Sequence, residues 1–179
     1  MIILTGVAGS GKSMQGKILA DEHGYAWIST GEILRVLVTG KRRHEMLQGK
    51  LLSDEEMITI LDKVFELIDP TQEFVLDGFP RTIPQADWLL EQVKTGRFSL
   101  TAIINLDASE DVVRGRLMSR GRQDDTDEAV NKRFHEYQTV TLPILDHFKR
   151  EGVTVYNIDA AQKPRAVHDE IVHHIDDKE

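Results

Sequence analysis

A glycine-rich loop close to the amino terminus constrains this chain more than any other part of its sequence. Residues 6–13 read GVAGSGKS and match the phosphate-loop pattern G-x-x-x-x-G-K-S/T at every fixed position. The loop follows the apolar run Ile2 to Thr5 and precedes a stretch that suits a helix. Its glycines allow a tight turn in which successive N–H groups face one concavity, and the helix adds its positive amino-terminal end. The pattern therefore predicts a strand, a loop and a helix that together hold the phosphates of a nucleotide.

Two side chains of this phosphate loop have predicted roles. Lys12 is expected to reach the terminal phosphates, and the Ser13 hydroxyl is expected to bind Mg²⁺. The alternative is a glycine-rich turn that only joins a strand to a helix, but a match at every fixed position favours the phosphate site. The dinucleotide-binding pattern G-x-G-x-x-G fails, because Met14 stands where its third glycine belongs.

Composition excludes several classes of protein. The 179 residues suffice for one domain, and the absence of cysteine excludes disulfides and cysteine-based zinc sites. A net charge of −8 argues against nonspecific binding to nucleic acid. No apolar stretch approaches membrane-spanning length, and too few residues precede Gly6 for a signal peptide. We therefore expect a cytoplasmic enzyme that binds neither nucleic acid nor membranes. A monomer is also expected, although composition does not establish the oligomeric state. Its seven histidines lack metal-ligand spacing and are expected at the surface.

Short apolar runs alternate with stretches of helical periodicity along the chain. The runs are apolar almost throughout, as expected for strands covered on both faces of a sheet. This alternation predicts an α/β fold with a parallel sheet and right-handed crossovers. Strands are expected at Ile2–Thr5, Tyr25–Ser29, Glu73–Asp77, Thr101–Leu106 and Val153–Ile158.

Several residues mark the boundaries of the predicted helices. Gly24 suits a carboxyl-terminal cap, Ser53 with Glu56 forms a capping box, and Pro84 suits a first helical turn. Residues 127–149 have the periodicity of one long helix, which Pro143 is expected to bend.

Two stretches interrupt the alternation of strands and helices. Residues 31–68 hold two or three helices between the second and third strands, and residues 120–126 form a polar loop between two helices. Inserts at the loop edge of a nucleotide-binding sheet are often lids. We therefore expect both stretches to lie beside the nucleotide site.

A carboxylate and a set of arginines point to phosphate chemistry. Asp77 follows a predicted strand, where such a carboxylate organises water or Mg²⁺, although an Asp-Gly turn is the alternative. Arginine suits phosphate because it donates bidentate hydrogen bonds and keeps its charge. The alternative for any single arginine is a solvated surface position. Four arginines bracket the polar loop: Arg116, Arg120, Arg122 and Arg133. Asp124 and Asp125 are expected either to hold these arginines when no phosphate is bound or to cap the next helix.

Taken together, these motifs resemble the adenylate kinases of the nucleoside monophosphate kinase family. The resemblance covers nearly the whole chain, and its strongest stretches are residues 28–35, 49–52, 77–87 and 122–125. It implies a three-layer fold around a five-stranded parallel sheet. It also implies a single domain over residues 1–179, with an AMP-binding insert at 30–52 and a very short lid at 120–126.

The resemblance also implies roles for individual residues. ATP would be held by Gly9, Ser10, Gly11, Lys12, Ser13, Met14, Arg116, Arg120 and Lys163. AMP would be held by Thr30, Arg35, Lys50, Leu52, Gly78, Arg81, Gln85, Arg122 and Arg133. The residues implied in catalysis are Lys12, Asp77, Arg81, Arg120, Arg122 and Arg133. Mg²⁺ would be bound by Ser13 and, through water, by Asp77.

The expected reaction is reversible phosphoryl transfer from MgATP to AMP, which gives two ADP. Thr30, Thr82 and the amide of Gln85 favour AMP as the acceptor within the family. The alternatives are a kinase that takes CMP or UMP, and a nucleotide-gated binding module with little turnover. The chain departs from the usual family pattern at Ala8, at Ser13-Met14, and in the shortness of both inserts. A shorter lid excludes water less well, which predicts ATP hydrolysis without an acceptor.

Overall fold

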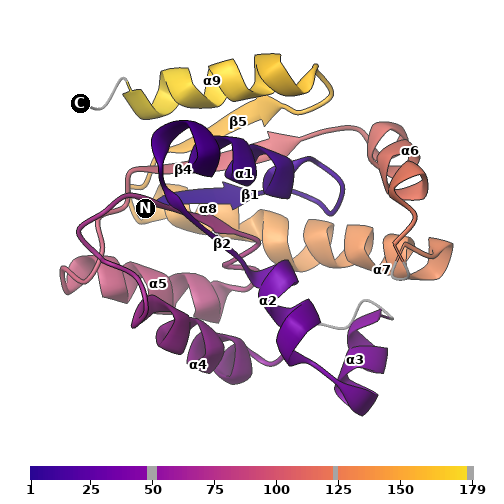
Figure 1. Ribbon diagram of the computed structural model, residues 1–179, viewed down its shortest axis with the longest axis horizontal. Helices are drawn as coiled ribbons and strands as arrows, with labels where there is room; N and C mark the ends of the chain where they lie inside the picture. Colours follow the sequence, from indigo (N-terminus) through magenta and orange to yellow (C-terminus); the bar gives the residue numbers. More distant parts are fainter. Residues whose placement is uncertain (48–51, 123–124, 177–179) are drawn as a thin grey trace.

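The computed structural model describes residues 1–47, 52–122 and 125–176, and its sheet has five parallel strands (Figure 1). The strand order is β2-β3-β1-β4-β5, which confirms the predicted α/β fold around a five-stranded parallel sheet. Each predicted strand is present, and no strand end differs from its predicted position by more than two residues. The strands are β1 (Ile2–Thr5), β2 (Ala26–Ser29), β3 (Phe74–Asp77), β4 (Ala102–Asp107) and β5 (Val155–Asp159).

Alternate strand residues enter two hydrophobic cores, one on each face of the sheet. Ile2 and Leu4 pack in the core that includes residues of α1 and α9, whereas Ile3 and Leu76 pack in the core that includes residues of α4, α5 and α8. Figure 1 shows α9 above the sheet and α5 below it, so the sheet is the middle layer of three. The helices are α1 (Lys12–His23), α2 (Thr30–Leu37), α3 (Gly40–Leu47), α4 (Asp54–Phe65), α5 (Ile83–Lys94), α6 (Glu110–Arg120), α7 (Asp127–Glu136), α8 (Leu142–Arg150) and α9 (Pro164–Asp176).

The predicted helix boundaries agree with the structure. Ser53 and Glu56 form the reciprocal capping box at the start of α4, and the Glu56 carboxylate accepts the Ser53 N–H at 3.1 Å. Gly24 ends α1 in the left-handed conformation, with its N–H donating to the Ala20 carbonyl. Pro84 lies in the first turn of α5.

The long helix predicted over residues 127–149 contains a π-helical turn just before its proline, and a bend there stays a prediction. A π-helical turn, Tyr137–Thr141, separates α7 from α8, and Pro143 lies in the first turn of α8. The Leu142 N–H donates to the Tyr137 carbonyl, five residues back. Pro143 has no N–H with which to continue the helical hydrogen bonds. The π-helical turn before it therefore separates the hydrogen-bond pattern of α7 from that of α8.

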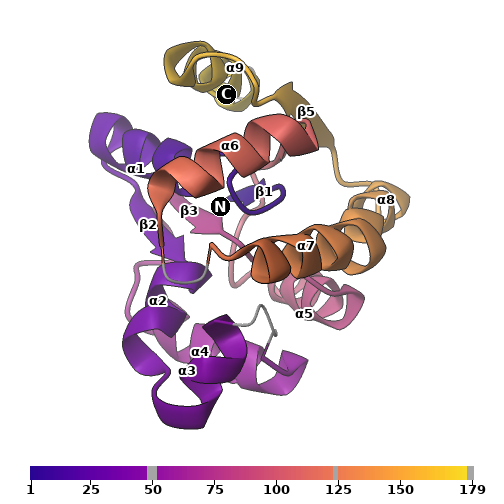
Figure 2. The ribbon, with the colours of Figure 1, turned by 90° about the vertical axis from the view of Figure 1, so that its right-hand side faces the viewer.

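The inserts project from one end of the sheet. Figure 2 views this end, with α2 and α3 below and the pair α6 and α7 across the carboxyl ends of the strands. A third apolar cluster joins Val7 of the phosphate loop to Val113 and Leu117 of α6 and to Val130 and Phe134 of α7.

Across the described residues, no helix is both long enough and apolar enough to cross a bilayer.

Candidate active site

The register of the sheet brings the predicted site together. Leu4 of β1 pairs with Asp77 of β3, and Asp77 also pairs with Ser29 of β2. The segments that follow these strands therefore begin side by side at the carboxyl edge, where ligands of parallel sheets bind. A cavity of about 1100 Å³ opens at this edge. The predicted site residues that line it are Gly9, Ser10, Gly11, Lys12, Ser13, Met14, Thr30, Arg35, Leu52, Asp77, Gly78, Arg81, Gln85, Arg116, Arg120, Arg122 and Arg133.

Of the predicted residues that the structure describes, one is not among those that line the cavity. Lys163 itself does not line it, although its neighbours Gln162 and Pro164 do. Lys50 lies outside the described residues.

Two glycines of the phosphate loop have conformations and surroundings that exclude a side chain. Gly6 has φ +139°, and a Cβ there would come within 2.5 Å of the Leu106 carbonyl oxygen. Gly9 has φ +88°, and a Cβ there would come within 2.9 Å of Val113 and Leu117. The loop therefore keeps its shape because it packs tightly on β4 and α6. Among the described residues, the buried Ser10 hydroxyl of this loop has no hydrogen-bond partner.

Lys12 turns back over the phosphate loop in this structure. Its ammonium donates to the carbonyl oxygens of Gly6 at 2.7 Å and Val7 at 2.9 Å. Burial lowers the pKa of Lys12 to about 8, although the charge of Asp77 opposes this shift. A phosphate group that accepted from Lys12 would relieve the cost of burying this cation.

Ser13 and Asp77 place two oxygen atoms beside each other at the floor of the cavity. The Ser13 hydroxyl donates to Oδ2 of Asp77 at 2.7 Å, and the Asp77 side chain is buried. A hydroxyl and a carboxylate are oxygen ligands of the kind that Mg²⁺ binds, directly or through water. The donor set therefore fits the predicted magnesium site. The Thr30 hydroxyl lies next to Asp77, because it donates to the backbone oxygens of Asp77 at 3.2 Å and Gly78 at 3.0 Å.

Asp125 holds the arginines around the polar loop. Arg120 donates two hydrogen bonds to its carboxylate, at 2.9 Å and 2.6 Å, and the Arg122 N–H donates a third at 3.2 Å. Arg133 lies 3.6 Å from the same carboxylate, whose side chain is only 1% exposed. Asp125 thus confirms the prediction that a carboxylate holds these arginines, whereas Asp124 lies outside the described residues.

Glu32 holds two further arginines from different parts of the chain. Its carboxylate accepts from Arg35 of α2 at 3.0 Å and from Arg122 of the polar loop at 3.2 Å. Arginines also share the oxygens of bound phosphates through charge-assisted hydrogen bonds of this kind. The Glu32 and Asp125 carboxylates therefore occupy donor groups that a phosphate would use.

Arg81 and Arg116 line the cavity with mainly backbone partners. Arg81 Nε donates to the Gly78 carbonyl at 2.7 Å, and burial lowers the pKa of Arg81, with the charge of Asp77 opposing the shift. Arg116 Nη1 lies 3.5 Å from the Ser10 carbonyl oxygen, beside the phosphate loop.

Burial also raises the pKa of Glu136, although nearby cations that include Arg81 oppose this shift.

The Gln85 amide is engaged within the protein. Its oxygen accepts the Arg81 N–H at 2.8 Å, and its nitrogen donates to Asp54 Oδ1 at 2.8 Å. Thr82 donates to the same Asp54 oxygen at 2.7 Å. In this structure Gln85 therefore fixes the turn that carries Arg81, and its contact with a nucleotide base remains a prediction.

Sequence reasoning did not assign roles to Glu32 or Glu136. Each lies three residues from a predicted phosphate-binding arginine on the same helix, Arg35 and Arg133 respectively. Side chains three residues apart share a helix face, so this spacing was the available signal.

Comparisons with known proteins agree with this arrangement. The family model described as adenylate kinase matches residues 4–153. The chain is similar to a protein named adenylate kinase from Corynebacterium urealyticum, with 38% identity over 165 residues that cover 89% of this chain and 90% of that protein. It is similar to adenylate kinase 1 of Nostoc sp., with 36% identity over 90% of this chain and 92% of that protein. It is also 35% identical to an adenylate kinase from Bacteroides fragilis over 84% of this chain and 85% of that protein.

Proposed function

The chain belongs to the adenylate kinase family, and we propose how its own residues perform the reaction of that family, the reversible transfer of a phosphoryl group from ATP to AMP. The reaction gives two ADP. One observation carries the assignment of roles: the phosphate loop and a set of arginines line the same cavity at the carboxyl edge of the sheet. Phosphoryl transfer asks little covalent chemistry of a protein, so positioning and charge neutralisation decide its rate.

The phosphate loop is the proposed donor site. The N–H groups from Gly9 to Met14, together with the unpartnered Ser10 hydroxyl, hold the ATP phosphates, and Lys12 exchanges its carbonyl partners for phosphate oxygens. Arg116 stacks on the base, and Lys163 lies near it. Ser13 and, through water, Asp77 hold the Mg²⁺ ion that accompanies ATP. When bound, this ion neutralises charge on the donor phosphates.

The acceptor site is proposed on the other side of the cavity. Arg35 and Arg81 hold the AMP phosphate, and Arg81 is already aimed by its bond to Gly78. The remaining proposed contacts to AMP come from Thr30, Lys50, Leu52, Gly78, Gln85, Arg122 and Arg133. Thr30 and Gln85 support AMP over the pyrimidine acceptors CMP and UMP.

Arg120, Arg122 and Arg133 are proposed to hold the phosphoryl group in transfer. These arginines leave Asp125 and Glu32 when phosphates enter. The negative charge that builds up during transfer is then neutralised by cations that already lie at the site. No strong base is needed, because the AMP phosphate is already largely ionised at neutral pH. We further propose that the enzyme is a cytoplasmic monomer whose partners are ATP, AMP and ADP, with no nucleic acid or membrane among them.

The acceptor is tested by ADP production from MgATP with AMP, dAMP, CMP, UMP or GMP offered separately. Turnover fastest with AMP supports the proposal, whereas faster turnover with CMP or UMP overturns the choice of acceptor. ATP binding without turnover would instead indicate a nucleotide-gated binding module.

The role of Arg81 is tested by Arg81→Ala, which should lower turnover by orders of magnitude while the protein stays folded. Arg150→Ala is the matched control, because Arg150 is exposed and does not line the cavity. Near-normal turnover of Arg81→Ala would remove this residue from the site.

A further inference from the structure

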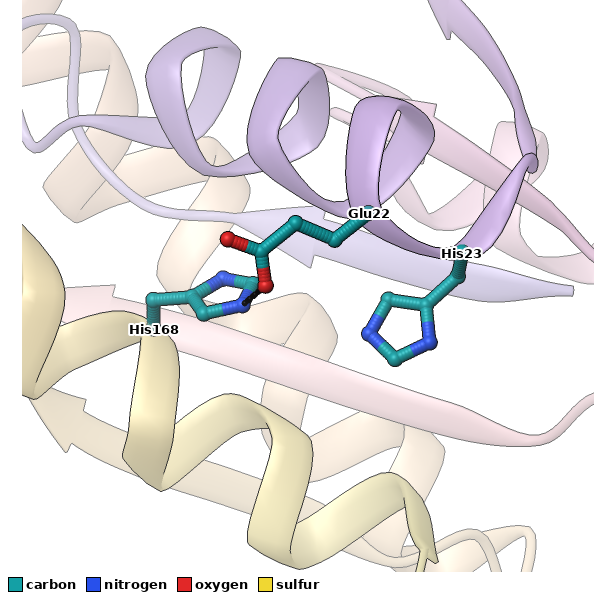
Figure 3. A group of neighbouring side chains, drawn as sticks. All are labelled: Glu22, His23 and His168. Atoms are coloured by element: carbon teal, nitrogen blue, oxygen red, sulfur yellow. Dashed lines mark hydrogen bonds and ion pairs between the residues drawn. The ribbon is translucent and has the colours of Figure 1, made fainter.

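Three side chains that the nucleotide site does not use gather between α1 and α9 (Figure 3). Glu22 and His23 end α1, and His168 lies in the second turn of α9. His168 Nε2 lies 3.0 Å from Oε2 of Glu22. One ring nitrogen of each histidine and one oxygen of Glu22 all lie within 4.8 Å of one another. This group lies outside the residues that line the nucleotide cavity.

The burial of His168 corrects the expectation that the histidines lie at the surface. Its side chain is 0% exposed, because it lies beside the apolar stripe of α9 formed by Val167, Ile171 and Ile175. Its Nδ1 atom has no hydrogen-bond partner among the described residues. Buried ring nitrogens normally have a partner, and a bound water or ion is one explanation when the protein offers none. Figure 3 shows the nitrogen-bearing edge of this ring turned toward Glu22.

We propose that Glu22, His23 and His168 form a binding site for Zn²⁺. Two imidazoles and one carboxylate are a known zinc ligand set, and imidazole favours zinc over Mg²⁺. Zinc bonds of about 2.0–2.2 Å in tetrahedral geometry place ligand atoms about 3.3–3.6 Å apart. His168 Nε2 and Glu22 Oε2 already lie 3.0 Å apart, and rotation of the exposed Glu22 and His23 side chains would bring all three ligand atoms to this spacing. The buried His168 provides the fixed ligand.

The surrounding charges are compatible with a cation at this site. Arg165 donates to Glu22 at 2.7 Å and also lies 2.9 Å from Asp169. When Glu22 turns to the metal, Arg165 keeps Asp169 as its partner, so no cation is left without a carboxylate.

The position of the site determines what the ion does. Near its other end, α1 is tied to α9 by a hydrogen bond from Gln15 Nε2 to the Pro164 carbonyl at 2.9 Å. At the end of α1 that carries Glu22, which already contacts Arg165 and His168 of α9, a metal bridge from Glu22 and His23 to His168 would add a further tie. Because the ion binds only the folded arrangement, it stabilises the fold without touching the nucleotides. The expected effect is a higher melting temperature with unchanged turnover.

The test uses the full chain without a polyhistidine tag, freed of metal with EDTA and kept free of nucleotide. Titration with Zn²⁺ alone, monitored by isothermal titration calorimetry, should show one binding site. Saturating Zn²⁺ should raise the Tm of the protein by about 5 °C or more. Co²⁺ in place of Zn²⁺ should give the intense visible absorption of a tetrahedral site. His23→Ala and Glu22→Gln should each weaken binding at least about tenfold.

His173→Ala is the matched control, since His173 lies exposed on the same helix outside the group. It should bind Zn²⁺ as the unchanged chain does. The tests rest on the exposed His23 and Glu22, because a change at the buried His168 risks the fold itself. Absence of binding to the unchanged chain, or equal binding by His23→Ala and Glu22→Gln, would overturn the proposal. Turnover measured with MgATP and AMP should be the same for His23→Ala as for the unchanged chain.

Discussion

Replacing Asp125 by asparagine should destabilise the free enzyme more than the nucleotide-bound enzyme. In this structure its carboxylate accepts from Arg120 and Arg122 and lies near Arg133. The Asp125→Asn substitution would keep the shape of the side chain and part of its hydrogen bonding, but it would remove the negative charge among these cations. The arginines would then repel one another until phosphates replaced the lost charge.

The size of the effect follows from the burial of the partners. Removing one member of a fully buried ion pair costs about 3–5 kcal/mol. Here the Asp125 side chain is 1% exposed, but Arg120 is 33% and Arg133 is 19% exposed, so solvent screens part of the remaining charge. We therefore expect a loss of about 2–3 kcal/mol, which for a domain of this size lowers Tm by about 4–12 °C.

Thermal melting with and without saturating nucleotide measures this prediction. The Tm difference between Asp125→Asn and the unchanged chain should shrink when MgATP and AMP are present. Asp146→Asn is the control, because Asp146 is exposed and lies 3.6 Å from Lys149 in a surface pair. An equal loss of Tm with and without nucleotide would refute the reasoning, because the carboxylate would then remain among the arginines in the bound state.

Three further predictions follow from the same site. Glu32→Gln removes the carboxylate that competes with phosphate for Arg35 and Arg122, so KM for AMP should fall by about two- to fivefold in steady-state assays. Because burial lowers the pKa of Lys12 to about 8 and bound phosphate favours its charged form, ATP binding should take up a proton above pH 8. Affinity should fall as pH rises through this range, and calorimetry in buffers of different ionisation enthalpy counts the proton; the absence of uptake at pH 9 would contradict the pKa shift. ATP hydrolysis without an acceptor should be measurable by ADP release, and its absence would show that the short polar loop excludes water.

The backbone framework of the site was predictable because it depends on local patterns. The phosphate loop, the strand before Asp77 and the capping residues Ser53 and Glu56 each carry their signal within a few neighbouring residues. Parallel pairing then places the ends of β1, β2 and β3 at one edge, whatever the side chains beyond them. The π-helical turn Tyr137–Thr141 was not predictable from Pro143, because several local distortions can absorb a missing N–H.

Side-chain partners across long sequence distances could not be predicted. The bond from Arg122 to Glu32 spans 90 residues, and which carboxylate an arginine selects depends on how the helices pack. Gln85 was predicted from the family pattern to bind AMP, yet packing gives both ends of its amide partners within the protein. His168 lies beside the apolar stripe of α9, and only the docking of that helix on α1 buries it.

The carboxylates of the free site turn nucleotide binding into an exchange of anions. A chain of net charge −8 collects arginines around one cavity, and unpaired they would repel one another. Arg122 contacts Asp125 through its backbone and Glu32 through its side chain, so it links the polar loop to α2. If the proposed roles of these arginines are right, a bound ligand supplies negative charge in place of both carboxylates. A single weak anion does not supply that charge, whereas the phosphates of ATP and AMP together do, which favours formation of the complete site when both substrates are present.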